Sequence, residues 1–258
     1  FLMHLMLISK NIPIKNIILV IDTDILNEID SKTNNKKTPK FNITFKEFFE
    51  KKSNNIIDIN KFEKSFVRDK GKDLVFISSG HGSIDGLENS KNNTYITYDY
   101  FENNASSENR TILLMSQCLA GAFHHLDTRK NICVIGASEY EYSVSLDFFT
   151  LCSLFGENSN SFYQALSFFD GVAINPFLFS FFSASLYSDD LMKYHRNKNL
   201  IHIYKYTAAS TNKILQKVQR RIDLELSTDS KSKEFRPEST TVIQSPFLLN
   251  KNLASCLI

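Results

Sequence analysis

Four short apolar runs, rich in β-branched residues and separated by helical or polar segments, constrain the fold of this chain more than any other feature. Such an alternation is typical of βαβ units, in which helices cover both faces of a parallel sheet. Each run also ends in small or polar residues, at the position where α/β sheets place their functional sites. We therefore expect an α/β fold with a mainly parallel sheet. The four runs span residues 15–22, 72–79, 110–117 and 130–138.

Helical spacing of apolar residues predicts helices between and after these runs. Asp58 is a suitable cap for one of them. In the polar segment 88–109 we expect a loop or small hairpin, with a helix that starts after Thr97, and the tail 242–250 returns to core-like residues. The predicted helices span residues 44–52, 58–71, 145–156, 160–171 and 207–226.

The charge balance and hydropathy argue against a nucleic-acid partner and a membrane span. The 30 Lys and Arg residues stand against 28 Asp and Glu residues, so the excess of positive charge typical of nucleic-acid-binding proteins is absent. Residues 171–188 carry no charge and approach the length of a membrane span, but Asn175, Pro176 and several serines favour a buried helix. We expect no nucleic-acid partner and no membrane span. A basic helix face is interpreted as solvated, with nucleic acid or anionic lipid as the alternative; it comprises Lys213, Lys217, Arg220 and Arg221.

The cysteines and acidic residues give no sign of a metal site. No Cys-x-x-Cys pair is present, and the cysteines are too widely spread for a disulfide framework, so we expect free thiols. Asp22 and Asp24 end the first run, and we interpret them as a loop and helix cap because no third ligand is in view. The cysteines are Cys118, Cys133, Cys152 and Cys256, of which the second and third lie in apolar, core-like segments.

Two of the runs end in residues that can carry chemistry. The sequence SGHG follows one run and places His81 between two glycines, and SQCLAG follows the next and places Cys118. If the two strands are neighbours in a parallel sheet, their carboxyl ends lie side by side and the two residues face one crevice. A thiol nucleophile and an imidazole that carries protons would then meet.

The glycines beside His81 leave room for a substrate. Backbone without a Cβ atom can approach a ligand closely, so the N–H of Gly82 can point at a developing oxyanion. Together with the N–H of Cys118, expected where a strand turns into a helix, it would supply two donors for a tetrahedral intermediate. A helix N-terminus also favours the reactive thiolate form of a cysteine.

The pair of apolar strands ending in SGHG and QCLAG resembles the caspase-like clan of cysteine peptidases, which includes caspases, metacaspases and legumains. The Cys-x-x-Gly spacing, followed by a third strand NICVIGAS, is most similar to the legumain-like family and its bacterial relatives. The resemblance implies a three-layer αβα sandwich of the caspase or haemoglobinase type. It also implies a dyad of His81, which protonates the leaving amine, and Cys118, the nucleophile, with Gly82 in the oxyanion hole.

The resemblance reaches Ser145, and IQSPF near the end resembles a Gln-x-Pro segment found late in some relatives. It divides the chain into a caspase-like peptidase core at residues 1–155, without the first strand of the family, and a helical C-terminal extension of the same domain at 156–258. Ser116 stands where legumains carry an acidic residue, so cleavage after Asn is not implied. Ser143, in the loop after the third strand, is the candidate for the wall of the substrate site.

The sequence therefore predicts a cysteine-type endopeptidase that hydrolyses a protein or peptide substrate through a thioester acyl-enzyme, with no metal or organic cofactor. A catalytically inactive pseudopeptidase that acts as an interaction or effector module is one alternative. A transamidase or ligase that uses the same dyad is another. Taken singly, a Gly-His-Gly sequence is typical of a turn and a lone cysteine of a small buried residue, so the prediction depends on their joint position. His124 and His125, about two turns beyond Cys118, are expected to pack or to face solvent.

Overall fold

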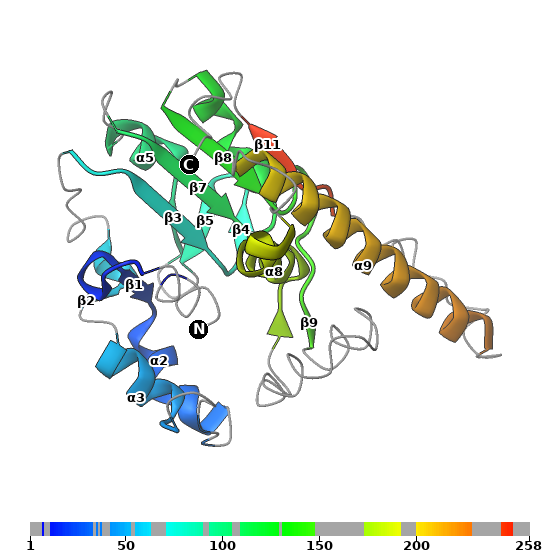
Figure 1. Cartoon of the computed structure of the whole chain (residues 1–258), viewed down its shortest axis with the longest axis horizontal. Helices are drawn as coiled ribbons and strands as arrows, with labels where there is room; N and C mark the ends of the chain where they lie inside the picture. The colour runs from blue at the N-terminus through cyan, green and yellow to red at the C-terminus, as the bar shows by residue number, and fades with distance from the viewer. Residues whose placement is uncertain are drawn as a thin grey trace.

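The computed structural model has a four-stranded central sheet with helices on both of its faces (Figure 1). This arrangement confirms a mixed α/β fold. The boundary expected between residues 155 and 156 lies outside the described residues, as does the predicted helix 160–171. The structure describes residues 7, 11–32, 35, 37, 42–52, 55–62, 71–89, 93–104, 109–128, 131–147, 173–191, 200–228 and 244–249.

The central sheet has the strand order β11-β8-β7-β3. Strands β3 (Leu74–Ser78), β7 (Thr111–Met115) and β8 (Ile132–Gly136) are parallel, and β11 (Phe247–Leu249) joins the edge of β8 antiparallel. Every residue of β7 and β8 is buried, as expected for central strands with both faces covered. Three of the four predicted strands therefore lie in one mainly parallel sheet, and the core-like tail supplies its edge strand.

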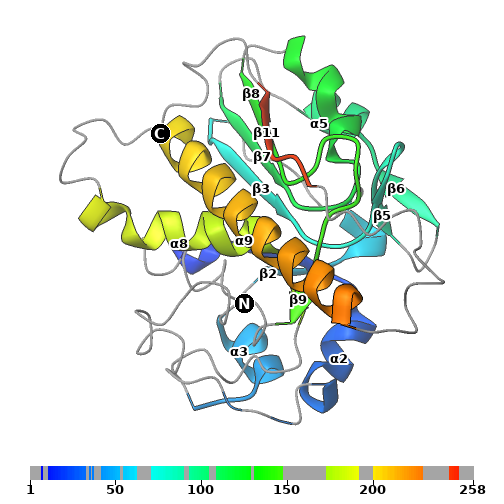
Figure 2. The ribbon, with the colours of Figure 1, turned by 90° about the vertical axis from the view of Figure 1, so that its right-hand side faces the viewer.

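One face of the sheet is covered by two long helices. Ile112 and Leu114 of β7 pack against α8 (Pro176–Leu191), which contributes Phe181, and against α9 (Leu200–Thr228). In Figure 2 these helices cross each other over the sheet. Residues 207–226, the predicted helix, form the larger part of α9.

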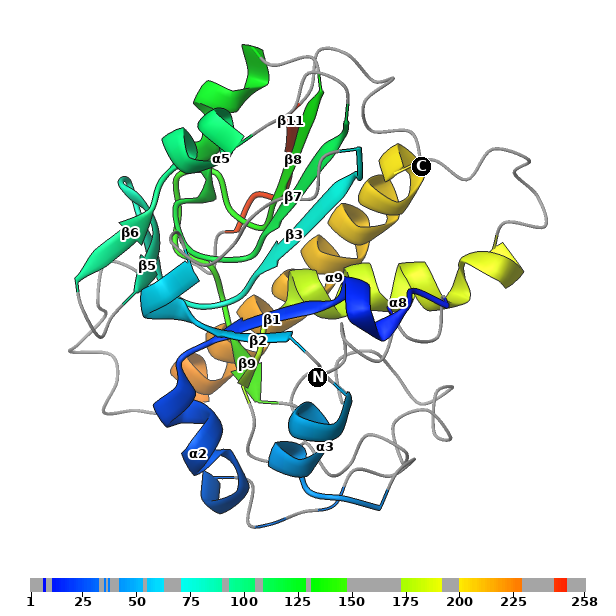
Figure 3. The same cartoon turned by 90° about the vertical axis from the view of Figure 1, so that its left-hand side faces the viewer.

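The opposite face carries shorter elements. Leu113 and Met115 alternate with Ile112 and Leu114 along β7, so they point to the opposite face. They pack against α5 (Tyr98–Asn104) and the 3-10 helix η3 (Ala120–Thr128), which contributes Phe123. Figure 3 shows α5 on the side of the sheet away from α8 and α9. The sheet thus lies between two layers of helices.

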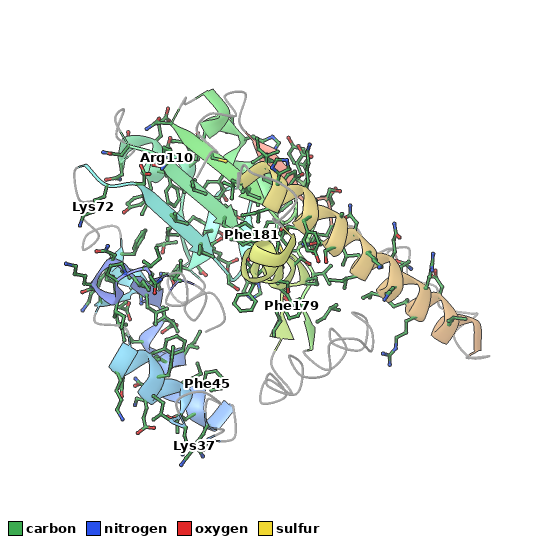
Figure 4. All side chains as sticks on the ribbon, viewed as in Figure 1. Lys37, Phe45, Lys72, Arg110, Phe179 and Phe181 are labelled. Atoms are coloured by element: carbon green, nitrogen blue, oxygen red, sulfur yellow. The ribbon has the colours of Figure 1, made fainter. Side chains whose placement is uncertain are left out.

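The first half of helix α8, residues 176–184, is mostly apolar and largely buried, as predicted for this segment. Phe177, Phe179 and Phe181 are at most 9% exposed, and the last two are labelled in Figure 4. Asn175 caps the helix by accepting the N–H of Phe177 at 2.9 Å, and Pro176 occupies the first helical position, which needs no N–H partner. Among the helices of the described residues, none has the length and hydropathy to cross a membrane.

The loop between β3 and β7 forms a small antiparallel sheet beside the central one. Strands β4 (Gly82–Ser83), β5 (Gly86–Asn89) and β6 (Thr94–Ile96) pair in this order. Helix α5 begins at Tyr98. The predicted hairpin with a helix start after Thr97 is therefore confirmed.

The N-terminal strand differs from the expectation. Strand β1 (Ile18–Ile21) forms where it was predicted, but it pairs in parallel with β2 (Asn55–Asp58) as a separate two-stranded sheet. The short β2 segment was not predicted, because two apolar residues between polar ones give little local signal. Val20 and Ile57 pack against the central core from this second sheet.

Polar side chains begin the helices of the N-terminal region. Asp22 accepts the N–H of Asp24 at 2.9 Å, which confirms its role as a cap. Thr44 and Glu47 form a capping box in which each side chain accepts the backbone N–H of the other residue. The elements of this region are η1 (Ile14–Asn16), α2 (Thr23–Lys32), α3 (Phe45–Lys52) and η2 (Ile59–Lys61).

Asp58 caps η2 by accepting the N–H of Asn60 at 2.9 Å, so the predicted helix 58–71 begins where expected, although with a 3-10 turn. Its residues 63–70 lie outside the described part of the chain.

Two other predictions are wrong. The predicted helix 145–156 instead starts as strand β9 (Leu146–Asp147), which pairs with β10 (Ala173–Ile174); local periodicity does not reveal a partner so far along the chain. Its remaining residues are not among those described. Cys133 is not a free thiol but is disulfide-bonded, which sequence spacing could not reveal.

Candidate active site at the carboxyl ends of two parallel strands

Strands β3 and β7 are neighbours, as the candidate site requires. Their parallel register places Ser78, the last residue of β3, opposite Met115, the last residue of β7. His81 and Cys118 each follow by three residues, at the edge of the sheet where both strands end. Figure 4 shows Lys72 and Arg110 at the opposite ends of the same strands.

Buried hydrogen bonds lock the two strand ends together. The hydroxyl of Ser78 donates to Oε1 of Gln117 at 2.5 Å, and the hydroxyl of Ser116 donates to the carbonyl oxygen of Ser78 at 2.6 Å. All three side chains are almost fully buried. The residues immediately before Cys118 are therefore fixed to the strand that leads to His81.

Cys118 is a partly exposed free thiol. Its Sγ atom accepts the backbone N–H of Ser143 at 3.2 Å. The next residue, Leu119, has a φ of 52°, a left-handed conformation that is uncommon outside glycine, and η3 begins at Ala120. The chain thus turns sharply at Cys118 and enters a 3-10 helix instead of the expected helix that starts at the cysteine.

Gly82 lies directly against the backbone of Cys118. A Cβ atom on Gly82 would stand 2.5 Å from the Cys118 carbonyl oxygen and would overlap the side chain of Gln117, so only glycine fits without displacement. Gly82 faces Leu87 as a pair that does not exchange hydrogen bonds. The hydrogen bond at this point runs instead from the N–H of Glu88 to the carbonyl oxygen of His81, at 3.0 Å. The N–H of Gly82 therefore points away from β5.

His81 is exposed in the turn between β3 and β4. Its carbonyl oxygen accepts the N–H of Glu88, which anchors the backbone of the turn to β5. Because Gly82 follows immediately and touches the backbone of Cys118, the backbone of His81 lies beside the cysteine loop. The imidazole extends from this anchored turn at the protein surface.

The backbone of Ser143 lies beside the thiol. Its hydroxyl donates to the carbonyl oxygen of Ser116 at 2.7 Å and accepts the side-chain N–H of Asn175 at 2.6 Å. Both hydrogen bonds of the hydroxyl are therefore made within the protein, and the backbone N–H faces the Cys118 sulfur. Ser143 borders the thiol through its backbone.

The loop that carries Ser143 is held to the cysteine loop along its length. The N–H of Leu119 donates to Glu141 at 3.1 Å, and that of Gly121 donates to Glu139 at 2.8 Å, both to carbonyl oxygens. Val144 donates its N–H to Oε1 of Gln244 at 2.9 Å. Gln244 belongs to the IQSPF sequence, which the fold thus brings beside the candidate site.

The two histidines after Cys118 pack within the fold, as expected. His124 lies 3.3 Å from a carboxylate oxygen of Glu139, and its ring packs against Tyr140 and Phe247. His125 packs its ring against Tyr98. Neither ring is needed to explain the contacts of the thiol.

Sequence reasoning missed the contacts of three polar residues of the site. Gln117 and Gln244 belong to the QCLAG and IQSPF sequences noted above, but no local pattern predicts that their side chains are buried. Asn175 could have been found, since an Asn-Pro pair at the start of an apolar helix is a typical cap. Its contact with Ser143 joins residues 32 positions apart and has no sequence signature.

The described residues contain no group of three or more His, Cys, Asp or Glu side chains that could hold a metal ion. The arrangement offers instead a thiol that receives an N–H, a nearby glycine N–H and a histidine on an adjoining turn. Such parts are those of nucleophilic acyl transfer. No family model, curated protein or solved structure matches this chain.

Proposed function

We propose that the protein is a cysteine peptidase with a caspase-like αβα core, in which Cys118 is the nucleophile and His81 carries the proton. The observation that supports it best is the direct contact between Gly82 and the Cys118 backbone at the ends of two parallel strands. This contact joins the turn of the histidine to the turn of the thiol. The caspase-like assignment also draws on the resemblance of the SGHG and QCLAG sequences to that clan.

In the proposed reaction every proton transferred and every bond formed or broken is accounted for. The Cys118 thiol proton passes to His81, and the thiolate attacks the carbonyl carbon of the scissile peptide. The N–H groups of Gly82 and Cys118 stabilise the oxyanion of the tetrahedral intermediate. The C–N bond breaks as His81 gives its proton to the leaving amine, which leaves a thioester. Water then attacks this thioester, which releases the acid and restores the thiol.

Peptide-library profiling with mass-spectrometric readout tests this proposal. The wild-type protein is expected to cut peptides, with activity lost in Cys118→Ala and reduced at least a hundredfold in His81→Ala. His202→Ala is a matched control, because His202 is exposed on α9. No cleavage by folded wild-type protein would reject a peptidase and favour an interaction module. Ligated products would instead favour a transamidase.

A further inference from the structure

Asn175, before the first residue of α8, is hydrogen-bonded to both segments that meet at the thiol. Its Nδ2 atom lies 2.6 Å from Oγ of Ser143, 3.0 Å from the carbonyl oxygen of Val144 and 3.4 Å from that of Ser116. Ser116 precedes Cys118 by two residues, and Ser143 donates its backbone N–H to Sγ of Cys118. One buried amide therefore connects the loop before the sulfur with the loop beside it.

The two ends of this amide have separate contacts. Oδ1 of Asn175 accepts the N–H groups of Phe177 and Leu178 at 2.9 and 3.2 Å, which caps α8. Serine, threonine or aspartate would serve equally well as a cap. The Nδ2 contacts with the site loops are therefore not explained by capping. Asn175 is 8% exposed, so these bonds are shielded from water and their loss is costly.

We propose that Asn175 is a positioning residue for Cys118: it holds Ser143 so that the Ser143 N–H stays directed at the sulfur. The inference rests on the proposed function, because it takes Cys118 to be the reactive group. A donated N–H stabilises the negative charge that the sulfur carries when it attacks an electrophile. Without the Asn175 amide, the loop is free to shift, and the thiol stays in place with less of this stabilisation.

The rate at which iodoacetamide alkylates Cys118 tests the proposal without a need for peptide cleavage. Digestion with trypsin yields residues 111–129, a fragment in which Cys118 is the sole cysteine. The Asn175→Ser variant keeps a helix cap and removes the amide donor. Its alkylation at neutral pH is expected to be about fivefold slower than in the wild type. The rates should converge in the unfolded proteins, where the contact with the Ser143 N–H is lost.

Two further variants separate positioning from stability. Thr44→Ala removes the cap of α3, far from the site in sequence, and is expected to lower stability while leaving Cys118 alkylation unchanged. Ser143→Ala removes the hydroxyl that Asn175 contacts and should slow alkylation like Asn175→Ser. The double variant should be no slower than either single variant, because all three break the same connection.

Asn175→Ser alkylation at the wild-type rate would overturn the proposal. A rate lowered by the same factor in the unfolded proteins would also overturn it, because the difference would then not come from the folded contacts. The outcome of this test can be told apart from the outcome of the peptidase test. Absence of peptide cleavage by the wild type rejects the peptidase, whereas the alkylation comparison still decides the role of Asn175.

Discussion

Gly82 touches the backbone of Cys118 so closely that a single added methyl group would stand 2.5 Å from the Cys118 carbonyl oxygen. The two residues follow adjacent parallel strands, and the contact lies where both strands have just ended. It links the turn of His81 to the turn of the thiol. The chemistry proposed for the site depends on this link.

The Gly82→Ala variant is expected to fold with reduced stability, by about 1 to 3 kcal/mol, because the methyl group must displace Gln117 or the Cys118 backbone. Peptide cleavage should fall at least tenfold, since a shift of the turn moves both the Gly82 N–H and His81. Urea unfolding and cleavage assays measure the two effects. Ser79→Ala is the control, because Ser79 is exposed on the same turn. Unchanged cleavage in Gly82→Ala would contradict the proposed role of this contact.

The Asp58 carboxylate links the two N-terminal strands to α2. The hydroxyl of Thr23 donates to it at 2.6 Å, and this hydrogen bond is the main cause that lowers the Asp58 pKa from 3.8 to about 2. A carboxyl pKa lowered by folding stabilises the native state above pH 3.8, and this contribution is lost as the pH falls toward about 2.

Thr23→Val should therefore raise the pKa of Asp58 toward 3.8, as an NMR titration would show. The free energy of unfolding should fall by about 1 kcal/mol at neutral pH, a modest value because solvent screens this carboxylate. The deficit should shrink as the pH falls through the same range. Thr23→Ser keeps the hydroxyl and should resemble the wild type. If the pKa of Asp58 were the same in Thr23→Val as in the wild type, the Thr23 hydroxyl would not be the cause of the lowered pKa.

Phe247 anchors the C-terminal edge strand to the sheet. Its ring packs over Gly136 of β8 and against the ring of His124, and it is 8% exposed. Phe247→Ala is expected to lower the free energy of unfolding by about 3 kcal/mol, the usual cost of removing a buried aromatic ring. Leu224→Ala, at a position that is 65% exposed, should change it by about 0.5 kcal/mol or less. If urea titration gave the same change in the free energy of unfolding for Phe247→Ala and Leu224→Ala, the packing assigned to Phe247 would be contradicted.

The central sheet was predictable because its strands are continuous apolar runs. The runs that became β3, β7 and β8 stand out from their polar flanks, and burial of both faces explains why β7 and β8 do not alternate. That β3 and β7 are neighbours, so that their carboxyl ends meet, was a condition of the site prediction, and the structure meets this condition. Short strands such as β2 and β9 escaped it because their pairing depends on partners elsewhere in the chain.

The candidate site was predictable only in its outline. His81, Gly82 and Cys118 stand at the ends of recognisable strands, so their residue types and positions suggested chemistry. The supporting contacts join distant positions, as Asn175 does with Ser143 and Gln244 with Val144. These contacts arise when α8 and the C-terminal tail pack against the sheet, and local sequence does not encode them.

The role of Cys118 and His81 is tested most directly by covalent labelling of the proposed nucleophile. A peptide that carries a thiol-reactive electrophile in place of its scissile bond is incubated with the folded protein, and the fragment 111–129 is examined by mass spectrometry. The account predicts stoichiometric modification of Cys118 in the wild type and at least a tenfold slower modification in His81→Ala, with His202→Ala unchanged. Failure of the folded wild type to be modified, or equal rates in wild type and His81→Ala, would contradict it.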